Sequence, residues 1–238
     1  MKRTLLVFTA ALTLFAMSNF QPVQAQDEDS PFSVGTDLVS NYVWRGSWFS
    51  GASFQPYVEY STGGFSLGAW GSFDFIGSFR EADLYAAYAF DFGLSLGLTD
   101  YYYPGTPYFE FDDSTGSHAF ELNVGYAVGG FSIGANYILN EAPNAGSIGG
   151  DMYFELGYGF DNVDIFVGAG NGWHTIEEVE YDEFGAEKEV DDEFGVVNVG
   201  VASSKEIKIS ESFSLPVGVA AIWNPYAEQF YIVGTISF

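Results

Sequence analysis

The sequence predicts an all-β chain that closes into an antiparallel transmembrane β-barrel of about twelve strands, within a range of ten to fourteen. Three observations lead to this fold class: apolar and other residues alternate along the last strand, connections alternate between short and long, and the chain begins with an export signal. Alternation with a period of two is the mark of a strand with two different environments on its two faces. A closed barrel also pairs every backbone group, which a bilayer requires.

The clearest strand is formed by the last ten residues, Gln229 to Phe238. One side carries Phe230, Ile232, Gly234, Ile236 and Phe238. At about 3.3 Å per residue and a tilt near 40°, this apolar side rises roughly 20 Å, which is close to the apolar band of an outer-membrane barrel. A strand that ends on Phe also resembles the closing strand that outer-membrane assembly machinery recognises. We therefore expect this machinery and outer-membrane lipid as partners.

The first 25 residues have the pattern of a cleavable secretory signal peptide. Lys2 and Arg3 precede an apolar run from Leu5 to Met17, and a small-x-small cleavage site ends at Ala25. The alternative, an anchoring helix, needs about 20 apolar residues, which this run does not supply. We therefore expect two segments, a signal peptide at 1–25 and a single barrel domain at 26–238.

The composition of the expected mature chain excludes several classes of function. It carries five basic residues against 32 acidic ones, a net charge of −27, so we expect no nucleic-acid partner. The chain has no cysteine, which removes disulfides and thiolate metal sites. We expect no cofactor and no metal. An aromatic content of 19% with 29 glycines suits a barrel with aromatic belts and a glycine-rich wall.

Twelve candidate strands follow one another along the chain. Tight turns at Ser61-Thr62-Gly63-Gly64, Asp91-Phe92-Gly93, Gly129-Gly130 and Asp161-Asn162 join neighbours into hairpins. A slightly longer turn holding Lys205 and Lys208 joins another pair. The expected strands are Phe32–Arg45, Ser53–Tyr60, Phe65–Asp74, Glu81–Phe90, Gly93–Tyr102, Ser117–Val128, Phe131–Leu139, Asp151–Phe160, Val163–Ala169, Gly195–Ala202, Ser212–Trp223 and Gln229–Phe238.

The remaining connections are longer and alternate with the tight turns. They are Gly46–Ala52, Phe75–Arg80, Tyr103–Gly116, Asn140–Gly150, Gly170–Phe194 and Asn224–Glu228. Short turns at one rim and long loops at the other are the arrangement of outer-membrane barrels, periplasmic against extracellular. A soluble β-sandwich, the main alternative fold, has no reason to sort its loops in this way.

Aromatic residues gather near both ends of the expected strands. Tyr60 and Phe65 lie near the short turns, whereas Trp44, Phe54 and Phe73 lie near the long loops, on the same parity as the apolar residues between them. Rings with an apolar body and a polar tip favour the headgroup depth of a membrane. The pattern therefore predicts one aromatic belt at each rim.

The opposite parity carries polar side chains, which we expect to line the lumen. A charge facing lipid would cost a few kcal/mol at the middle of the bilayer. Arg45 is the one cation in this set, and we expect it to pair with Asp37, Glu59 or Glu121, either bracing the wall or narrowing a pore. The predicted lumen-lining residues are Asp37, Asn41, Arg45, Glu59, Asp83, Glu121, Asn123 and Glu155.

Small residues on the same parity predict some free cross-section. They are Gly68, Ala87, Gly97, Gly125, Gly157, Gly168 and Gly200. Eight-stranded barrels are filled by side chains and sixteen-stranded barrels hold a water channel, so twelve strands lie between these cases. A narrow lumen lined by acids would attract cations and repel anions.

One stretch of sequence resembles a known family. Gly35-Thr36-Asp37-Leu38-Val39-Ser40-Asn41-Tyr42-Val43-Trp44-Arg45-Gly46 is similar to the opening of TorF-type porins, a bacterial outer-membrane family, and Lys205–Pro216 followed by Asn224-Pro225 resembles its Bacteroidetes-like version. The likeness covers about a dozen residues at the start and about twenty near the end. It implies the cell outer membrane and a barrel fold more than it implies an activity.

Three functions are compatible with these patterns. The first is a porin-like channel for passive diffusion of small solutes, with a preference for cations. The second is a non-conducting structural or adhesive barrel that acts through its outer loops. The third is a lipid-acting enzyme, which would need Ser and His on the lipid-facing surface. The sequence favours a non-enzymatic protein.

Two further features of the sequence are candidate sites. The only histidines, His118 and His174, are expected to be rim residues. The acidic connection 170–194 could bind a divalent cation or a basic ligand, but it lacks the D-x-D-x-D-G spacing of a calcium loop. We therefore expect a solvated loop there, with a hairpin tip near Ile176–Tyr181 that extends beyond the membrane.

Overall fold

The computed structural model describes residues 30–175, 193–211 and 213–238. The expected signal peptide at 1–25 and most of the acidic connection at 170–194 lie outside the described residues. None of the helices in the described ranges has the length and apolar character that crossing a membrane requires.

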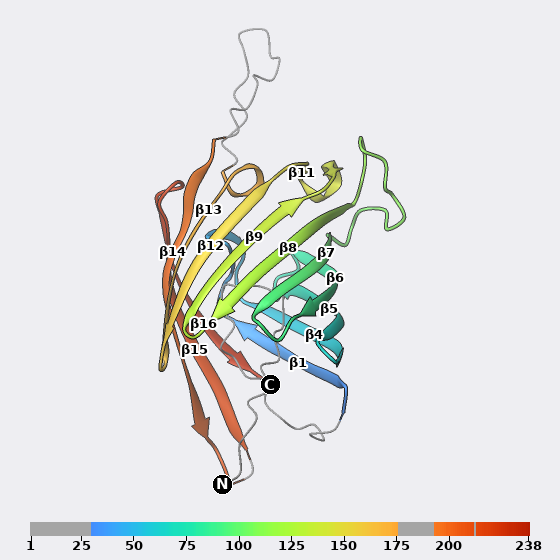
Figure 1. Cartoon of the computed structure of the whole chain (residues 1–238). Helices are drawn as coiled ribbons and strands as arrows, with labels where there is room; N and C mark the ends of the chain where they lie inside the picture. The colour runs from blue at the N-terminus through green and yellow to red at the C-terminus, as the bar shows by residue number, and fades with distance from the viewer. Residues whose placement is uncertain (1–29, 176–192, 212) are drawn as a thin grey trace.

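Twelve antiparallel strands form one closed barrel, as the sequence predicts (Figure 1). Around the barrel the order is β1-β16-β15-β14-β13-β12-β9-β8-β7-β6-β5-β4, and β4 closes the ring by pairing with β1. Except where the ends of the chain meet, barrel neighbours are also successive strands of the barrel in sequence. The barrel strands are β1 (Phe32–Val39), β4 (Ser53–Thr62), β5 (Phe65–Asp74), β6 (Arg80–Ala89), β7 (Leu94–Tyr102), β8 (His118–Val128), β9 (Phe131–Ile138), β12 (Met152–Phe160), β13 (Val163–Gly170), β14 (Gly195–Lys208), β15 (Ser214–Asn224) and β16 (Gln229–Ser237).

Four short strands and two 3-10 helices belong to the long connections. They are β2 (Tyr42–Trp44), β3 (Ser47–Ser50), β10 (Glu141–Ala142), β11 (Ser147–Ile148), η1 (Pro143–Ala145) and η2 (Gly172–His174). β2 pairs with β3 and β10 pairs with β11, each pair forming a two-stranded sheet separate from the barrel. Long connections and tight turns alternate along the chain, as expected from the sequence.

The alternation along each strand sorts side chains between the two faces of the wall. In β16, Phe230 and Ile232 are 62% and 61% exposed, whereas Val233 is 1% exposed. The same contrast is seen in β8, where Leu122 is exposed and Glu121 and Asn123 are buried. The outer face is therefore apolar and the inner face is rich in polar groups, which is the reverse of a soluble barrel.

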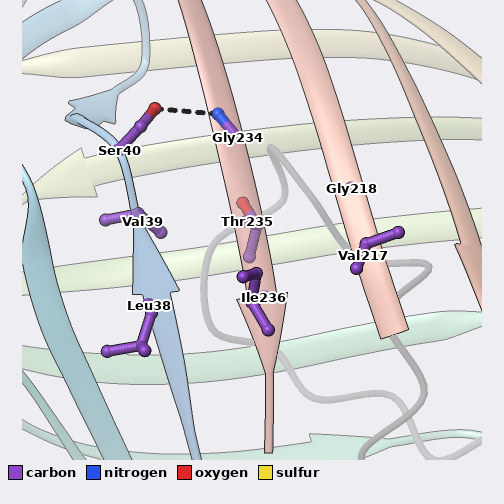
Figure 2. A pocket seen from close by; sticks show the side chains of 8 residues that line it. All are labelled: Leu38, Val39, Ser40, Val217, Gly218, Gly234, Thr235 and Ile236. Carbon is purple, nitrogen blue, oxygen red and sulfur yellow. Dashed lines mark hydrogen bonds between the residues drawn. The ribbon is translucent and has the colours of Figure 1, made fainter. Parts of the chain in front are cut away.

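The first strand is shorter than predicted, because β1 ends at Val39 instead of Arg45. Ser40 still bonds to β16: its N–H donates to the carbonyl of Gly234, and its hydroxyl accepts the Gly234 N–H at 2.9 Å (Figure 2). The amide of Asn41 donates to the Ile232 carbonyl at 3.2 Å. These contacts end the seam between β1 and β16, and the chain then turns into the lumen as hairpin β2–β3.

An apolar hollow of about 440 Å³ lies along this seam (Figure 2). Leu38 and Ser40 line it from the β1 side, Gly234 and Ile236 from β16, and Val217 from β15. The hollow exists because Gly234 and Ser40 contribute almost no side-chain volume between larger apolar neighbours. The seam is also short, with Cα partners only from Asp37–Ser237 to Val39–Thr235 within the named strands.

The hairpin β14–β15 differs from the prediction at its turn. The expected strand Gly195–Ala202 continues to Lys208, which pairs with Ser214, so Lys205 and Lys208 lie in a strand instead of a turn. Both strands reach beyond the tight turns of their neighbours (Figure 1). The alternation of Ile207 with charged residues carries the strand further than the apolar stretch alone indicates.

Candidate functional site in the lumen

The candidate site is built around hairpin β2–β3, which crosses the inside of the barrel. Its turn is Arg45-Gly46, with φ of 50° and 85° respectively, the positive values that a tight two-residue hairpin turn requires. A Cβ on Gly46 would lie 1.9 Å from the carbonyl oxygen of Val197 in β14. The carbonyl of Gly46 accepts a hydrogen bond from the Asn224 amide of β15 at 3.1 Å. The tip of the hairpin is therefore docked on the wall at β14 and β15.

Arg45 fastens this tip to a third part of the wall. Its Nη2 lies 2.8 Å from Oε1 and 2.9 Å from Oε2 of Glu121 in β8. The guanidinium carbon lies 4.3 Å from the ring centre of Trp44 and 4.6 Å from that of Tyr153. The Tyr101 hydroxyl donates to Glu121 Oε2 at 3.2 Å. Of the three expected partners of Arg45, the structure selects Glu121.

Aromatic rings fill the space around the hairpin. Trp44 contacts Tyr101, Trp173 and His174 with ring centres 5.2–5.9 Å apart, and Tyr42 contacts Trp70 at 5.6 Å. The prediction that Trp44 belongs to an outer aromatic belt is wrong, because Trp44 is buried inside the barrel. The cluster contains Tyr42, Trp44, Phe49, Trp70, Phe79, Tyr101, Tyr103 and Trp173.

His174 in η2 belongs to the same inner cluster, so the prediction that it is a rim residue is also wrong. It is buried between the rings of Trp44 and Tyr153. Burial, together with the positive charge of Arg45, lowers the pKa of His174 well below its ordinary value of 6.5. The imidazole is therefore neutral at neutral pH, which suits its place beside a guanidinium.

The other predicted lumen residues form hydrogen-bonded groups on the inner wall. Glu59 accepts bonds from Tyr85 at 3.0 Å and from Ser61 at 2.6 Å. Asp37 accepts a bond from Ser237 at 2.5 Å across the seam. These carboxylates are held by neutral hydroxyl groups instead of by Arg45.

A second group lies on β7, β8, β9, β12 and β14. Thr99 donates to Asn123 at 2.8 Å, and Asn123 donates to Asn136 at 2.9 Å. Glu155 accepts bonds from the hydroxyl of Tyr153 and, at 3.0 Å, from the amide of Asn198. Asp83 is buried on β6. Asn41 lies beyond the end of β1, and its amide donates to the Ile232 carbonyl at the seam with β16.

Three of the small residues predicted on the inner wall, Gly68, Gly168 and Gly200, do not leave the space that the sequence suggested. A Cβ on Gly68 would lie 2.4 Å from the Tyr85 ring, one on Gly168 2.1 Å from the Tyr153 hydroxyl, and one on Gly200 2.2 Å from the Phe166 ring. These glycines make room for large side chains of neighbouring strands that lie across them. Gly134 has nothing within 4 Å of a Cβ and is a different case.

His118 is placed on the outer side of the wall but is not an exposed rim residue. Connection 103–116 covers it, with Phe111 stacked on its ring at 4.7 Å. Its Nδ1 lies 2.9 Å from Asp100, and its Nε2 lies 2.5 Å from the carbonyl oxygen of Tyr108. Both ring nitrogens are thus occupied by acceptors that hold the connection against the barrel.

Sequence reasoning missed the inner aromatic cluster and the hairpin that carries it. The Arg45-Gly46 pair was the available signal, because a glycine after a polar residue is typical of a tight hairpin turn. Trp173 beside His174 gave no comparable signal, because η2 has no periodic pattern.

Comparison with known proteins does not identify a family. No family model matches the chain, and no curated protein matches it. Among solved structures, a triple-substituted porin of Rhodopseudomonas blastica matches with 11% identity and a TM-score of 0.39, covering 88% of this chain and 73% of that chain. A second variant of the Rh. blastica porin matches with 12% identity and a TM-score of 0.41, covering 88% and 74%. Likeness at this level carries no inference about activity.

Proposed function

We propose that this protein is a porin-like channel of the bacterial outer membrane through which small solutes diffuse passively, with hairpin β2–β3 as its constriction. The observation that carries the proposal is the closed barrel with an apolar outer face and a polar inner face, crossed by a hairpin fixed to the wall through Arg45 and Glu121. A barrel of this kind meets lipid outside and water inside. The resemblance of residues 35–46 to TorF-type porins supports the same assignment.

We also propose that this channel prefers cations. The inner wall carries Asp37, Glu59, Asp83 and Glu155, whereas the guanidinium of Arg45 is paired with Glu121. An excess of fixed negative charge along a narrow path raises the local concentration of cations and lowers that of anions.

Single-channel recording of the refolded chain in a planar bilayer tests both parts. We expect discrete current steps, and a reversal potential in a salt gradient that has the sign for cation selectivity. Asp37→Asn combined with Glu59→Gln should reduce this selectivity, whereas Asp91→Asn, in a tight turn at the rim, is the matched control and should not. Absence of current above leak contradicts the channel, and a reversal potential of the opposite sign contradicts cation preference alone.

A second candidate is a non-conducting barrel that acts through its outer loops. The close packing of Trp44, Tyr101 and Trp173 around the hairpin favours it, because these rings occupy the lumen. Arg45→Ala distinguishes the two candidates. If the hairpin is a constriction, the variant conducts more than the wild type, whereas a sealed structural barrel stays silent in both forms.

The geometry around His118 gives no support to a lipid-acting enzyme. An esterase of this type needs a histidine nitrogen that can take the proton of a serine hydroxyl. In the described part of the chain, the two nitrogens face Asp100 and the Tyr108 carbonyl. We therefore propose a structural role for His118 in holding connection 103–116.

A further inference from the structure

Two acidic side chains on the inner face of β6 are buried, and neither has a positive partner in the part of the chain that the structure describes. Glu81 and Asp83 are two residues apart on one strand, so both point to the same side of the wall. Glu81 is 2% exposed and Asp83 is 5% exposed. Their carboxylates lie close enough to interact electrostatically. This pair is the least expected feature of the lumen, because two buried like charges repel one another.

Both carboxylates keep one oxygen without a hydrogen-bond partner within the described ranges, Oε2 of Glu81 and Oδ1 of Asp83. The Tyr42 hydroxyl lies near the Glu81 carboxylate, and the backbone N–H of Tyr102 lies near that of Asp83. A buried acceptor that is left unpaired costs about 1–3 kcal/mol, and more when it is charged. The two free oxygens therefore point to a group that residues 30–175, 193–211 and 213–238 do not supply.

The nearby positive side chains do not fill this role. Arg45 is paired with both oxygens of Glu121. Arg80 precedes Glu81 in the same strand, so it lies on the other face of the wall, where it is exposed. The other buried carboxylates differ in this respect, since Glu59 and Glu155 are each held by two donor groups.

The surroundings limit what could neutralise the pair. Trp70 faces Asp83 on β5, and Tyr42, Phe79 and Tyr103 form linked ring contacts over the same part of the wall. Ring carbons do not coordinate metal ions, so the atoms here that can coordinate an ion are carboxylate and hydroxyl oxygens. Oxygen donors are the ligands that calcium and other hard cations prefer.

We propose that Glu81 and Asp83 form a binding site for one divalent hard cation of the calcium type. One such ion matches the two negative charges and would use the free oxygens, with the Tyr42 hydroxyl and water as further ligands. The described residues contain no group of three or more Asp, Glu, His or Cys side chains suited to a metal. With only two carboxylates, the expected affinity lies near the weak extracellular range, a Kd of about 10⁻⁴–10⁻³ M. The site does not depend on conduction.

Calcium-dependent stability of the refolded full chain tests the site. Unfolding by urea is followed by tryptophan fluorescence with calcium chloride at about ten times the expected Kd, and with the chelator EGTA in place of calcium. Binding to the folded state should lower the unfolding equilibrium constant about tenfold. Glu81→Gln combined with Asp83→Asn should abolish this response and should make the barrel at least as stable as the wild type in EGTA.

Two controls keep the test specific. Glu59→Gln removes another buried lumen carboxylate and should retain the full calcium response. The acidic connection 170–194 is present in every variant, so its own ion binding does not distinguish them. Asp83→Asn alone should weaken the response, and it replaces the double variant if that chain does not refold. An equal calcium response in the wild type and in the variants of Glu81 and Asp83 overturns the site. So does a wild type whose stability is insensitive to calcium, which would mean that the pair is neutralised by protons.

Discussion

The attachment of hairpin β2–β3 to the wall gives the sharpest prediction for stability. Arg45→Met removes the guanidinium but keeps an apolar side chain beside Trp44 and Tyr153. The Arg45 side chain is 12% exposed and that of Glu121 is 1% exposed, so solvent cannot take over the missing charge. Removing one partner of a buried ion pair typically costs about 3–5 kcal/mol, because the other charge stays buried and unpaired. The two guanidinium–ring contacts contribute about 0.5–2 kcal/mol each, and this contribution is already included in the loss of about 3–5 kcal/mol.

The assay is a double-mutant cycle measured by urea unfolding of the refolded barrel. Glu121→Gln alone should cost a similar amount, because it leaves Arg45 without its counter-charge. Combining Arg45→Met with Glu121→Gln should cost clearly less than the sum of the two single losses, with a coupling of at least about 2 kcal/mol. Strictly additive losses, or single losses below about 1 kcal/mol, would refute the view that this ion pair holds the hairpin.

Three further predictions concern other parts of the barrel. Gly200→Ala should destabilise the protein by about 1–3 kcal/mol because the new Cβ would meet the Phe166 ring. Gly134→Ala, where a Cβ has nothing within 4 Å, should be tolerated. Equal urea-unfolding midpoints for the two variants would contradict the close approach of Phe166 to Gly200. Ser40→Ala should cost about 1 kcal/mol through loss of the bond to Gly234, and hydrogen exchange at the Gly234 amide should rise. The unfolded chain protonates its histidines near pH 6.5 while His174 stays neutral in the fold, so stability should fall as the pH drops below about 6.5; His174→Gln should reduce this slope in pH-dependent urea unfolding, and an unchanged slope would contradict it.

The wall of the barrel could be predicted from the sequence because each strand meets two different environments. In β16, Phe230 and Ile232 face outward and Val233 faces inward, as the alternation requires. The pairing of strands could also be predicted from the sequence, since a tight turn such as Gly129-Gly130 places the two strands that it joins side by side. These are local signals that do not depend on how the lumen is filled.

The contents of the lumen could not be predicted in the same way. Trp44 continues the alternation of β1, so its parity matches that of a lipid-facing ring. An aromatic cluster inside a barrel and an aromatic belt outside it are both apolar surroundings, and the sequence pattern does not separate them. The prediction from the inner glycines failed for a related reason. Gly168 makes room for the Tyr153 side chain of the neighbouring strand, and the residues around Gly168 in the sequence do not indicate that this ring lies there.

The short contact between β1 and β16 also bears on how the cylinder is completed. Every other junction joins strands that are close in sequence and can zip together from a turn, whereas this one unites the two ends of the domain, with Asp37 opposite Ser237. This junction can close only when the other strands already form a curved sheet. Its partners have the largest sequence separation in the barrel, so we expect it to form last. A shift of the β1–β16 register by one residue would turn the apolar side of β16 toward the lumen. We therefore infer that the Ser40–Gly234 hydrogen bond helps to fix this register.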